Sequence, residues 1–159
     1  TEEHKGILIC GANNSGKTVY LRSIATALLF AKNGLPIPAE SAVISPYHNL
    51  FSLFASGEKA SSIGTGAGRF EEEVSALSEI IDMLQAHDIL FLNEIFQTTA
   101  YDEGAVGLYH ILNHLNKQNV RWVVVSHLTK LFSLFDKNEV VTLTTTDPTG
   151  DNPHKLLQK

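Results

Sequence analysis

GILICGANNSGKTVYLRSIATALLFAK, at residues 6–32, contains three consecutive patterns that fix the architecture. The first five residues form a short apolar run, which predicts a buried strand. GANNSGKT, at residues 11–18, then matches the phosphate-loop pattern G-x-x-x-x-G-K-[ST] at every fixed position. From Lys17 to Lys32 the apolar residues recur at helical spacing, and Asn33-Gly34 ends the pattern. A strand, a glycine loop and a helix in this order predict a nucleoside-triphosphate site.

The residue types of the loop suit phosphate chemistry. Two glycines let the backbone curl so that successive N–H groups point inward, and the following helix adds the positive end of its dipole. We expect Lys17 to reach the β- and γ-phosphates of ATP and the Thr18 hydroxyl to ligate Mg²⁺. The alternative, a fortuitous glycine turn beside a surface lysine, does not explain the strand–loop–helix context. The predicted nucleotide-binding residues of this loop are Gly11, Ala12, Asn13, Asn14, Ser15, Gly16, Lys17 and Thr18.

The remaining hydrophobic pattern alternates between strand-like and helical segments. Buried strands are predicted at 89–92 and 121–125, an edge strand at 139–146, and a candidate strand at Val43-Ile44. Helices are predicted from Phe70, at 103–118 and at 128–135, and a glycine-rich loop at 57–68. This rhythm predicts an α/β domain with a mostly parallel sheet flanked by helices, with its ligand at the carboxyl ends of the strands.

Asn93-Glu94 follows the apolar run at 89–92. In phosphate-loop enzymes this strand lies beside the loop, and its end supplies a carboxylate to the Mg²⁺ shell. Glu94 is the candidate to orient or deprotonate the attacking water, and Asn93 occupies the metal position, where Asp is usual. Asn offers an oxygen of similar reach without the charge, so weak Mg²⁺ affinity or slow hydrolysis is expected. Alternatively, the pair only caps the strand and meets solvent.

The segment before the helix at Phe70 contains Gly64, Gly66 and Gly68, followed by Arg69. It is either a flexible surface loop or a second anion-facing helix start, directed at a nucleotide on another subunit, with Arg69 as its cation. The acidic triplet at 71–73 is expected to cap the helix and to be solvated.

Ser126-His127 directly follows the strand at 121–125. This position places His127 at the carboxyl end of the sheet, where it could contact the γ-phosphate. The alternative role of His127 is to cap the next helix.

Composition excludes several classes of protein. The 159 residues and a hydrophobic fraction of 43% fit one compact domain, 1–159, and no apolar run approaches the length of a bilayer span. A single cysteine fits a reducing, cytoplasmic setting. The net charge of −5, with 12 scattered Lys and Arg, disfavours a domain that grips duplex DNA by itself. We therefore expect a piece of a longer protein, with DNA contacted by other parts.

These residues together resemble the ATPase domain of the MutS family of DNA mismatch-repair proteins, over nearly the whole chain. GANNSGKT with Tyr20-Leu21-Arg22 resembles the family segment G-P-N-M-x-G-K-S-T-Y-L-R. GLPIPA, at residues 34–39, resembles G-x-x-V-P-A. GRFEEE, NEIFQTTAYDEG and VSH, at residues 68–73, 93–104 and 125–127, stand where the family has S-T-F-x-x-E, D-E-I-G-R-G-T-S-x-x-D-G and A-T-H. The first of these three segments matches at Phe70 and Glu73.

The resemblance implies an ABC-type ATPase head that pairs with a second head, as in a homodimer, with two ATP molecules held between them. Residues 11–18 would bind phosphate and Mg²⁺, Glu94 would serve hydrolysis, His127 would lie on the γ-phosphate side, and Gly68-Arg69 would face the partner's nucleotide. ATP use would drive a clamp around duplex DNA that is formed by domains outside this chain.

Two departures suggest a divergent relative. Gly68 replaces the signature serine, and Asn93 replaces the acidic metal ligand. A nucleotide-gated interaction module with vestigial hydrolysis is therefore an alternative function. Another ABC-type ATPase, such as a transporter or chromosome-maintenance head, is a further alternative, but no segment of this sequence matches the L-S-G-G-Q-like signature of those proteins. A small-molecule kinase would need an arginine-rich lid, and none is evident in the sequence.

Overall fold

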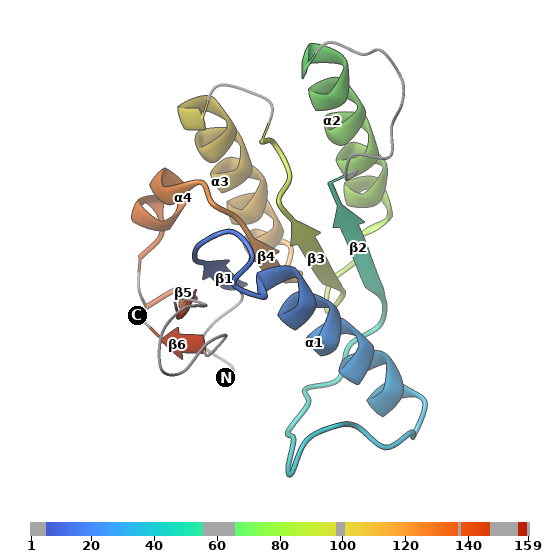
Figure 1. Cartoon of the computed structure of the whole chain (residues 1–159). Helices are drawn as coiled ribbons and strands as arrows, with labels where there is room; N and C mark the ends of the chain where they lie inside the picture. Colours follow the sequence, from blue (N-terminus) through green and yellow to red (C-terminus); the bar gives the residue numbers. More distant parts are fainter. Residues whose placement is uncertain (1–5, 56–65, 98–100, 137, 147–155, 159) are drawn as a thin grey trace.

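The computed structural model describes residues 6–55, 66–97, 101–136, 138–146 and 156–158 (Figure 1). Its strands are β1 (Gly6–Cys10), β2 (Leu50–Phe54), β3 (Ile89–Asn93), β4 (Arg121–Val125), β5 (Val140–Thr145) and β6 (Leu156–Gln158). Its helices are α1 (Lys17–Lys32), α2 (Gly66–Met83), α3 (Tyr101–Lys117) and α4 (Thr129–Leu134).

The strands form one sheet in the order β2-β3-β4-β1-β5-β6. β1 to β5 are parallel to their neighbours, and β6 pairs antiparallel with β5. The sheet is thus mostly parallel, as the sequence predicts. In the register, Ile9 of β1 lies beside Val125 of β4, and Val125 lies beside Asn93 of β3. The carboxyl ends of these three strands therefore meet at one edge of the sheet.

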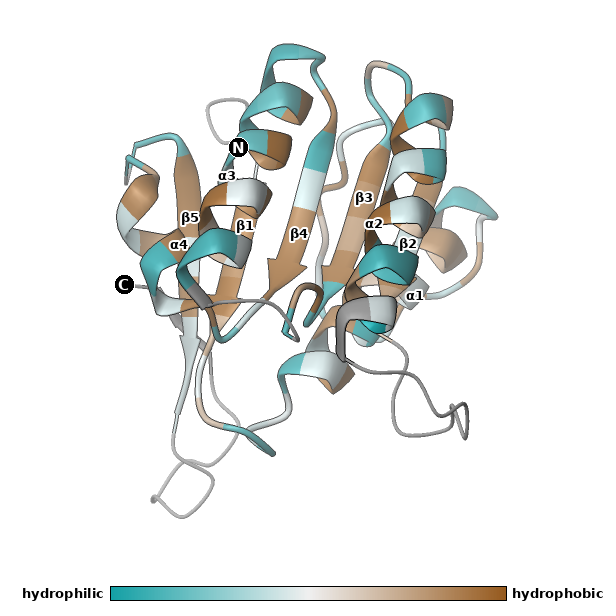
Figure 2. Ribbon diagram, turned by 90° about the horizontal axis from the view of Figure 1, so that it is seen from above, coloured by the Kyte–Doolittle hydropathy of each residue, from teal (hydrophilic) through white to brown (hydrophobic). Residues whose placement is uncertain are grey.

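Successive side chains of the central strands point to opposite faces, and each face has its own core. On one face, Leu8, Leu92 and Val124 belong to a cluster that α2, α3 and α4 cover. On the other, Ile9, Phe91 and Val125 pack against α1, whose Leu21 is fully buried. Figure 2 is seen from the side of α2, α3 and α4 and shows the apolar strands of the sheet behind these three helices. Because both faces of the sheet are covered, the sequences of these strands are continuous apolar runs.

Several details differ from the sequence-based expectations. The strand predicted at an edge, β5, lies between β1 and β6, so it is an interior strand. Val43-Ile44 forms no strand, and β2 forms instead at 50–54, where no strand was predicted. β4 lies between β3 and β1 in the sheet, and the end of β3 still lies beside the phosphate loop, as expected. This order is set by long-range pairing, which local sequence does not encode.

The helix expected to start at Phe70 starts at Gly66. Gly68 and Arg69 consequently lie in its first turns and not in a loop, whereas residues 57–65, with Gly64, fall outside the described residues. Within the described parts of the chain, no helix is long and apolar enough to cross a membrane.

Candidate functional site

The predicted phosphate loop joins β1 to α1 and curls through positive backbone angles. φ is 143° at Gly11, 61° at Asn14 and 89° at Gly16. The last of these is the N-cap of α1, and none of the described side chains makes a capping hydrogen bond there. The first N–H groups of a helix have no partner within the helix, so α1 presents N–H donors and a positive dipole end to the loop. This arrangement suits an anion.

The floor of the loop is fixed by β5. Thr145 shares a 2.6 Å hydrogen bond with the hydroxyl of Ser15 and donates to the carbonyl of Cys10 at 3.3 Å. A Cβ on Gly11 would lie 1.8 Å from Thr145 Oγ1. Only glycine therefore fits at this position, both for its φ and for its space.

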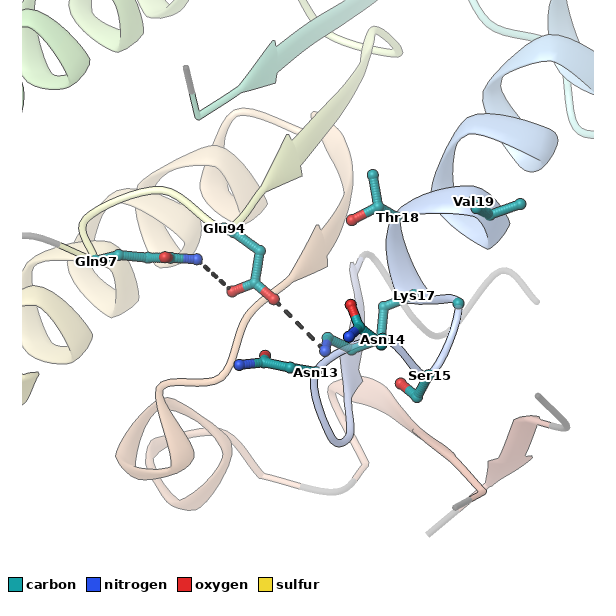
Figure 3. Close-up of a pocket in the computed structure, with 9 residues that line it drawn as sticks. Asn13, Asn14, Ser15, Lys17, Thr18, Val19, Glu94 and Gln97 are labelled. Carbon is teal, nitrogen blue, oxygen red and sulfur yellow. Dashed lines mark hydrogen bonds and ion pairs between the residues drawn. The ribbon is translucent and has the colours of Figure 1, made fainter. Parts of the chain in front are cut away.

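Lys17 has a buried side chain, 5% exposed, whose ammonium lies at the mouth of the loop. Its Nζ donates to the carbonyls of Gly11 at 3.0 Å and Ala12 at 2.8 Å, and lies 3.7 Å from Glu94 Oε1. The loop therefore remains curled around its own lysine. Above it is a hollow of about 670 Å³, lined by Asn13, Asn14, Ser15, Gly16, Lys17, Thr18, Val19, Glu94 and Gln97 (Figure 3).

Two polar residues, Asn93 and Glu94, stand at the end of β3. Glu94 lines the hollow, and Asn93 contacts Thr18 at its border. Thr18 Oγ1, in the first turn of α1, donates to Asn93 Oδ1 at the end of β3 at 2.9 Å, although β4 lies between β3 and β1 in the sheet. Outside the gaps in the description, no group of three or more His, Cys, Asp and Glu side chains is arranged to hold a metal ion. Two adjacent neutral oxygens nevertheless fit Mg²⁺, which prefers oxygen ligands and takes few from protein when phosphates supply the rest.

Glu94 connects the loop to the end of β4. Besides its contact with Lys17, Glu94 Oε2 accepts hydrogen bonds from His127 Nδ1 at 2.8 Å and from Gln97 Nε2 at 2.9 Å. Because a carboxylate only accepts, the imidazole proton of this bond belongs to Nδ1. The Glu94 side chain is 15% exposed and that of His127 is 37% exposed, so both can be reached from the solvent. The structure thus brings Lys17, Glu94 and His127 into one contact network.

A family model described as MutS domain V matches residues 7–157. The chain belongs to the MutS family. Domain V is the ATPase domain of MutS proteins, so family membership accounts both for the resemblance in the sequence and for the phosphate loop.

Individual proteins similar to this chain belong to the same family. The Endonuclease MutS2 of Clostridium botulinum (strain Okra / Type B1) is 30% identical over 141 residues, which are 88% of this chain and 18% of that protein. The mitochondrial DNA mismatch repair protein mutS homolog of Sarcophyton glaucum is 28% identical over 134 residues, 84% of this chain and 13% of that protein. Endonuclease MutS2 of Halothermothrix orenii is 28% identical over 131 residues, 82% of this chain and 16% of that protein. The chain spans less than a fifth of the length of each.

The two MutS-family positions expected to face a partner lie apart from this hollow. Gly68 is half-buried and Arg69 is exposed in α2, and neither lines the hollow described above. Apart from the adjacent residues and the backbone of α2 itself, no heavy atom of the described residues lies within 4 Å of a Cβ built on Gly68. The structure therefore has room at this position for the serine usual in the MutS family.

Three residues of this MutS domain make contacts in or next to the site that no sequence motif indicated. Gln97 binds the Glu94 carboxylate, and Thr145 supports the loop from β5. Glu73 was expected to be solvated like Glu71 and Glu72, but it is 7% exposed and accepts a hydrogen bond from the backbone N–H of Phe96. Its helical spacing from Phe70 and Leu77, which pack in the core, is the signal that could have revealed this.

Proposed function

We propose that this chain is the ATP-binding and hydrolysing head of a MutS-related DNA-repair protein. The observation that carries the proposal is the Lys17–Glu94–His127 network at the mouth of an intact phosphate loop. A buried lysine, a carboxylate and an imidazole are the groups needed to bind a triphosphate and to activate water beside it. Family membership supports the same assignment.

Each side chain has a proposed role. Lys17 and the N–H groups of residues 11–18 bind the phosphates, and Thr18 and Asn93 hold Mg²⁺. The metal, when bound, neutralises charge on the β- and γ-phosphates. Glu94 orients the attacking water and accepts its proton, and His127 holds the Glu94 carboxylate through Nδ1 on the γ-phosphate side. The pairing of Lys17 with Glu94 keeps both charges compensated before a nucleotide arrives.

The wider assembly is also part of the proposal. We infer an ABC-type head that pairs with a second copy, so that Gly68 and Arg69 of one head approach the nucleotide of the other. Their position at the start of α2, away from their own hollow, is compatible with a contact in trans. Duplex DNA would be bound by parts of the longer protein, in keeping with the acidic balance of this chain and with a cytoplasmic location.

Nucleotide binding is tested with Lys17→Ala. The purified protein is titrated with a fluorescent ATP analogue and Mg²⁺, and the variant should lose at least a hundredfold in affinity. Lys117→Ala is a matched control, because Lys117 is exposed at the end of α3. Equal affinity of the wild type and Lys17→Ala would refute nucleotide binding by this loop.

The catalytic role of Glu94 is separable. Glu94→Gln should retain ATP affinity and lower phosphate release by about a hundredfold or more, since Gln cannot accept the proton. Glu79→Gln, at an exposed position of α2, controls for the loss of one charge. If Glu94→Gln turned over ATP at the wild-type rate, another group would have to activate the water.

Asn93 favours a second candidate function, a nucleotide-gated interaction module whose hydrolysis is vestigial. The neutral amide bonded to Thr18 gives the metal no negative charge from β3. This alternative predicts ATP-dependent pairing of the full-length protein with no phosphate release above that of Glu94→Gln. The ATPase proposal predicts release that rises when the heads pair.

A further inference from the structure

The backbone that presents Glu94 is strained. φ is 52° at Glu94 and 63° at Phe96, and the buried Ile95 lies between them. Left-handed angles cost residues with a Cβ about 1–2 kcal/mol each. Such a turn persists only where the surroundings over-determine it, so the groups that hold its two ends control where the carboxylate points.

Within the described parts of the chain, a hydrogen bond to another element holds each end of this turn. The N–H of Glu94 donates to the Val125 carbonyl of β4 at 2.9 Å. The N–H of Phe96 donates to Oε2 of Glu73 in α2 at 2.7 Å. The first anchor is backbone to backbone and independent of side-chain identity. The second depends on a single carboxylate.

The Glu73 side chain is buried, as expected for a residue that holds the N–H of Phe96. It is 7% exposed, whereas Glu71 and Glu72 beside it are exposed. Burying a carboxylate is costly unless a charge-assisted hydrogen bond compensates for it. Phe70 lies three residues before Glu73 in α2. Its ring centroid is 5.3 Å from that of Phe96, and this contact holds α2 against the strained segment at 94–96.

We propose that Glu73 is a positioning residue for Glu94. Its carboxylate holds the Phe96 end of the strained turn, so that the Glu94 carboxylate stays within reach of His127 and Lys17. The significance for catalysis rests on the proposed ATPase function, whereas the position of Glu94 can be measured without nucleotide.

The test uses Glu73→Ala, which removes the acceptor, and Glu73→Gln, whose amide oxygen can still accept from Phe96. Glu72→Ala is the matched control on the exposed side of the same turn. The ring ¹⁵N chemical shifts of His127 report its bond to Glu94 in the nucleotide-free protein, and Glu94→Gln gives the reference for a lost carboxylate. kcat and KM are measured on the longer protein that contains this chain.

For Glu73→Ala we expect the His127 shifts to move toward those of Glu94→Gln. We also expect kcat to fall about ten- to hundredfold, with KM within about twofold, because the displaced group acts on water and not on nucleotide binding. Glu73→Gln should restore most of both readouts, and Glu72→Ala should change neither. A structural defect of α2 alone would not separate kcat from KM or be rescued by Gln.

Wild-type His127 shifts in folded Glu73→Ala would overturn the proposal. If that variant does not fold, Glu73→Asp decides, because its shorter carboxylate keeps the charge but cannot reach Phe96; wild-type shifts there have the same meaning. A failed ATPase proposal is recognised separately, by Lys17→Ala binding ATP as well as the wild type, and leaves the chemical-shift test valid.

Discussion

Gly11→Ala should lower the stability of this domain and its ATP affinity, because the new methyl group would collide with a single atom, Thr145 Oγ1. The new Cβ would lie 1.8 Å from Thr145 Oγ1, so the threonine hydroxyl would have to move about 1.6 Å to reach ordinary contact at 3.4 Å. That movement breaks its hydrogen bonds to Ser15 and Cys10. An alanine at φ 143° is strained as well. The cost combines strain, about 1–3 kcal/mol, with two hydrogen bonds at about 0.5–1.5 kcal/mol each, so about 2–6 kcal/mol in total.

Urea unfolding followed by circular dichroism measures this cost, and a double-mutant cycle assigns its cause. Thr145→Ala should destabilise the wild type by about 1–3 kcal/mol but cost almost nothing beside Gly11→Ala, because the same hydrogen bonds are already broken. Gly34→Ala is the control for backbone strain: φ is 70° there, and no described atom outside the adjacent residues lies within 4 Å of its Cβ. Additive losses from Gly11→Ala and Thr145→Ala would refute the reasoning, as would a Gly11→Ala protein that binds ATP with wild-type affinity.

Three further substitutions test other parts of the domain. Asn93→Asp should raise the Mg²⁺ dependence of ATP affinity, by about tenfold in titrations with and without the metal, because it adds a charge beside Thr18; surface Asn138→Asp should not. Gly68→Ser should leave the stability within about 0.5 kcal/mol, since its Cβ meets open space, and should raise phosphate release only in the paired full-length protein. Tyr47→Phe should cost about 1 kcal/mol in urea unfolding through loss of the bond to the Leu28 carbonyl. Burial raises the pKa of Tyr47, so the neutral hydroxyl is favoured in the fold, and the stability gap to Tyr47→Phe should shrink as the pH rises above about 10.

The phosphate-loop unit and the central strands were predictable because their signals are local. A buried parallel strand reads as an apolar run, and a complete phosphate-loop motif is specific when it stands between a strand pattern and a helical pattern. The family model confirms the resemblance on which the ATPase assignment rests, whereas the roles of Glu94, His127 and Gly68-Arg69 stay predictions.

The parts that could not be predicted depend on long-range contacts. β2, LFSLF, is half-buried and broken by an exposed serine, so it lacks a clean strand pattern. The position of β4 between β1 and β3 requires β4 to pair with β1, which lies more than a hundred residues earlier in the chain. Val74 has helical spacing with the apolar residues Leu77 and Ile81, but Val74 is 41% exposed and Glu73 is turned inward. Helical spacing alone does not show which of two consecutive residues, Glu73 or Val74, is buried. The group that favours Glu73 is the N–H of Phe96, which lies outside α2.

The intervening strand β4 has a consequence for how this site can move. Its end is bonded to both neighbours: Ser126 N–H donates to the Ile9 carbonyl at 3.1 Å, and Glu94 N–H donates to the Val125 carbonyl at 2.9 Å. A continuous set of backbone hydrogen bonds thus runs from the phosphate-loop strand to the candidate catalytic residue. Changing the distance between these two backbones would break that set at a buried position, which is costly. Lys17 and Glu94 can therefore separate most cheaply by side-chain rotation, and any larger motion that reaches Glu94 must enter from the other end of its turn, through Phe96 and α2.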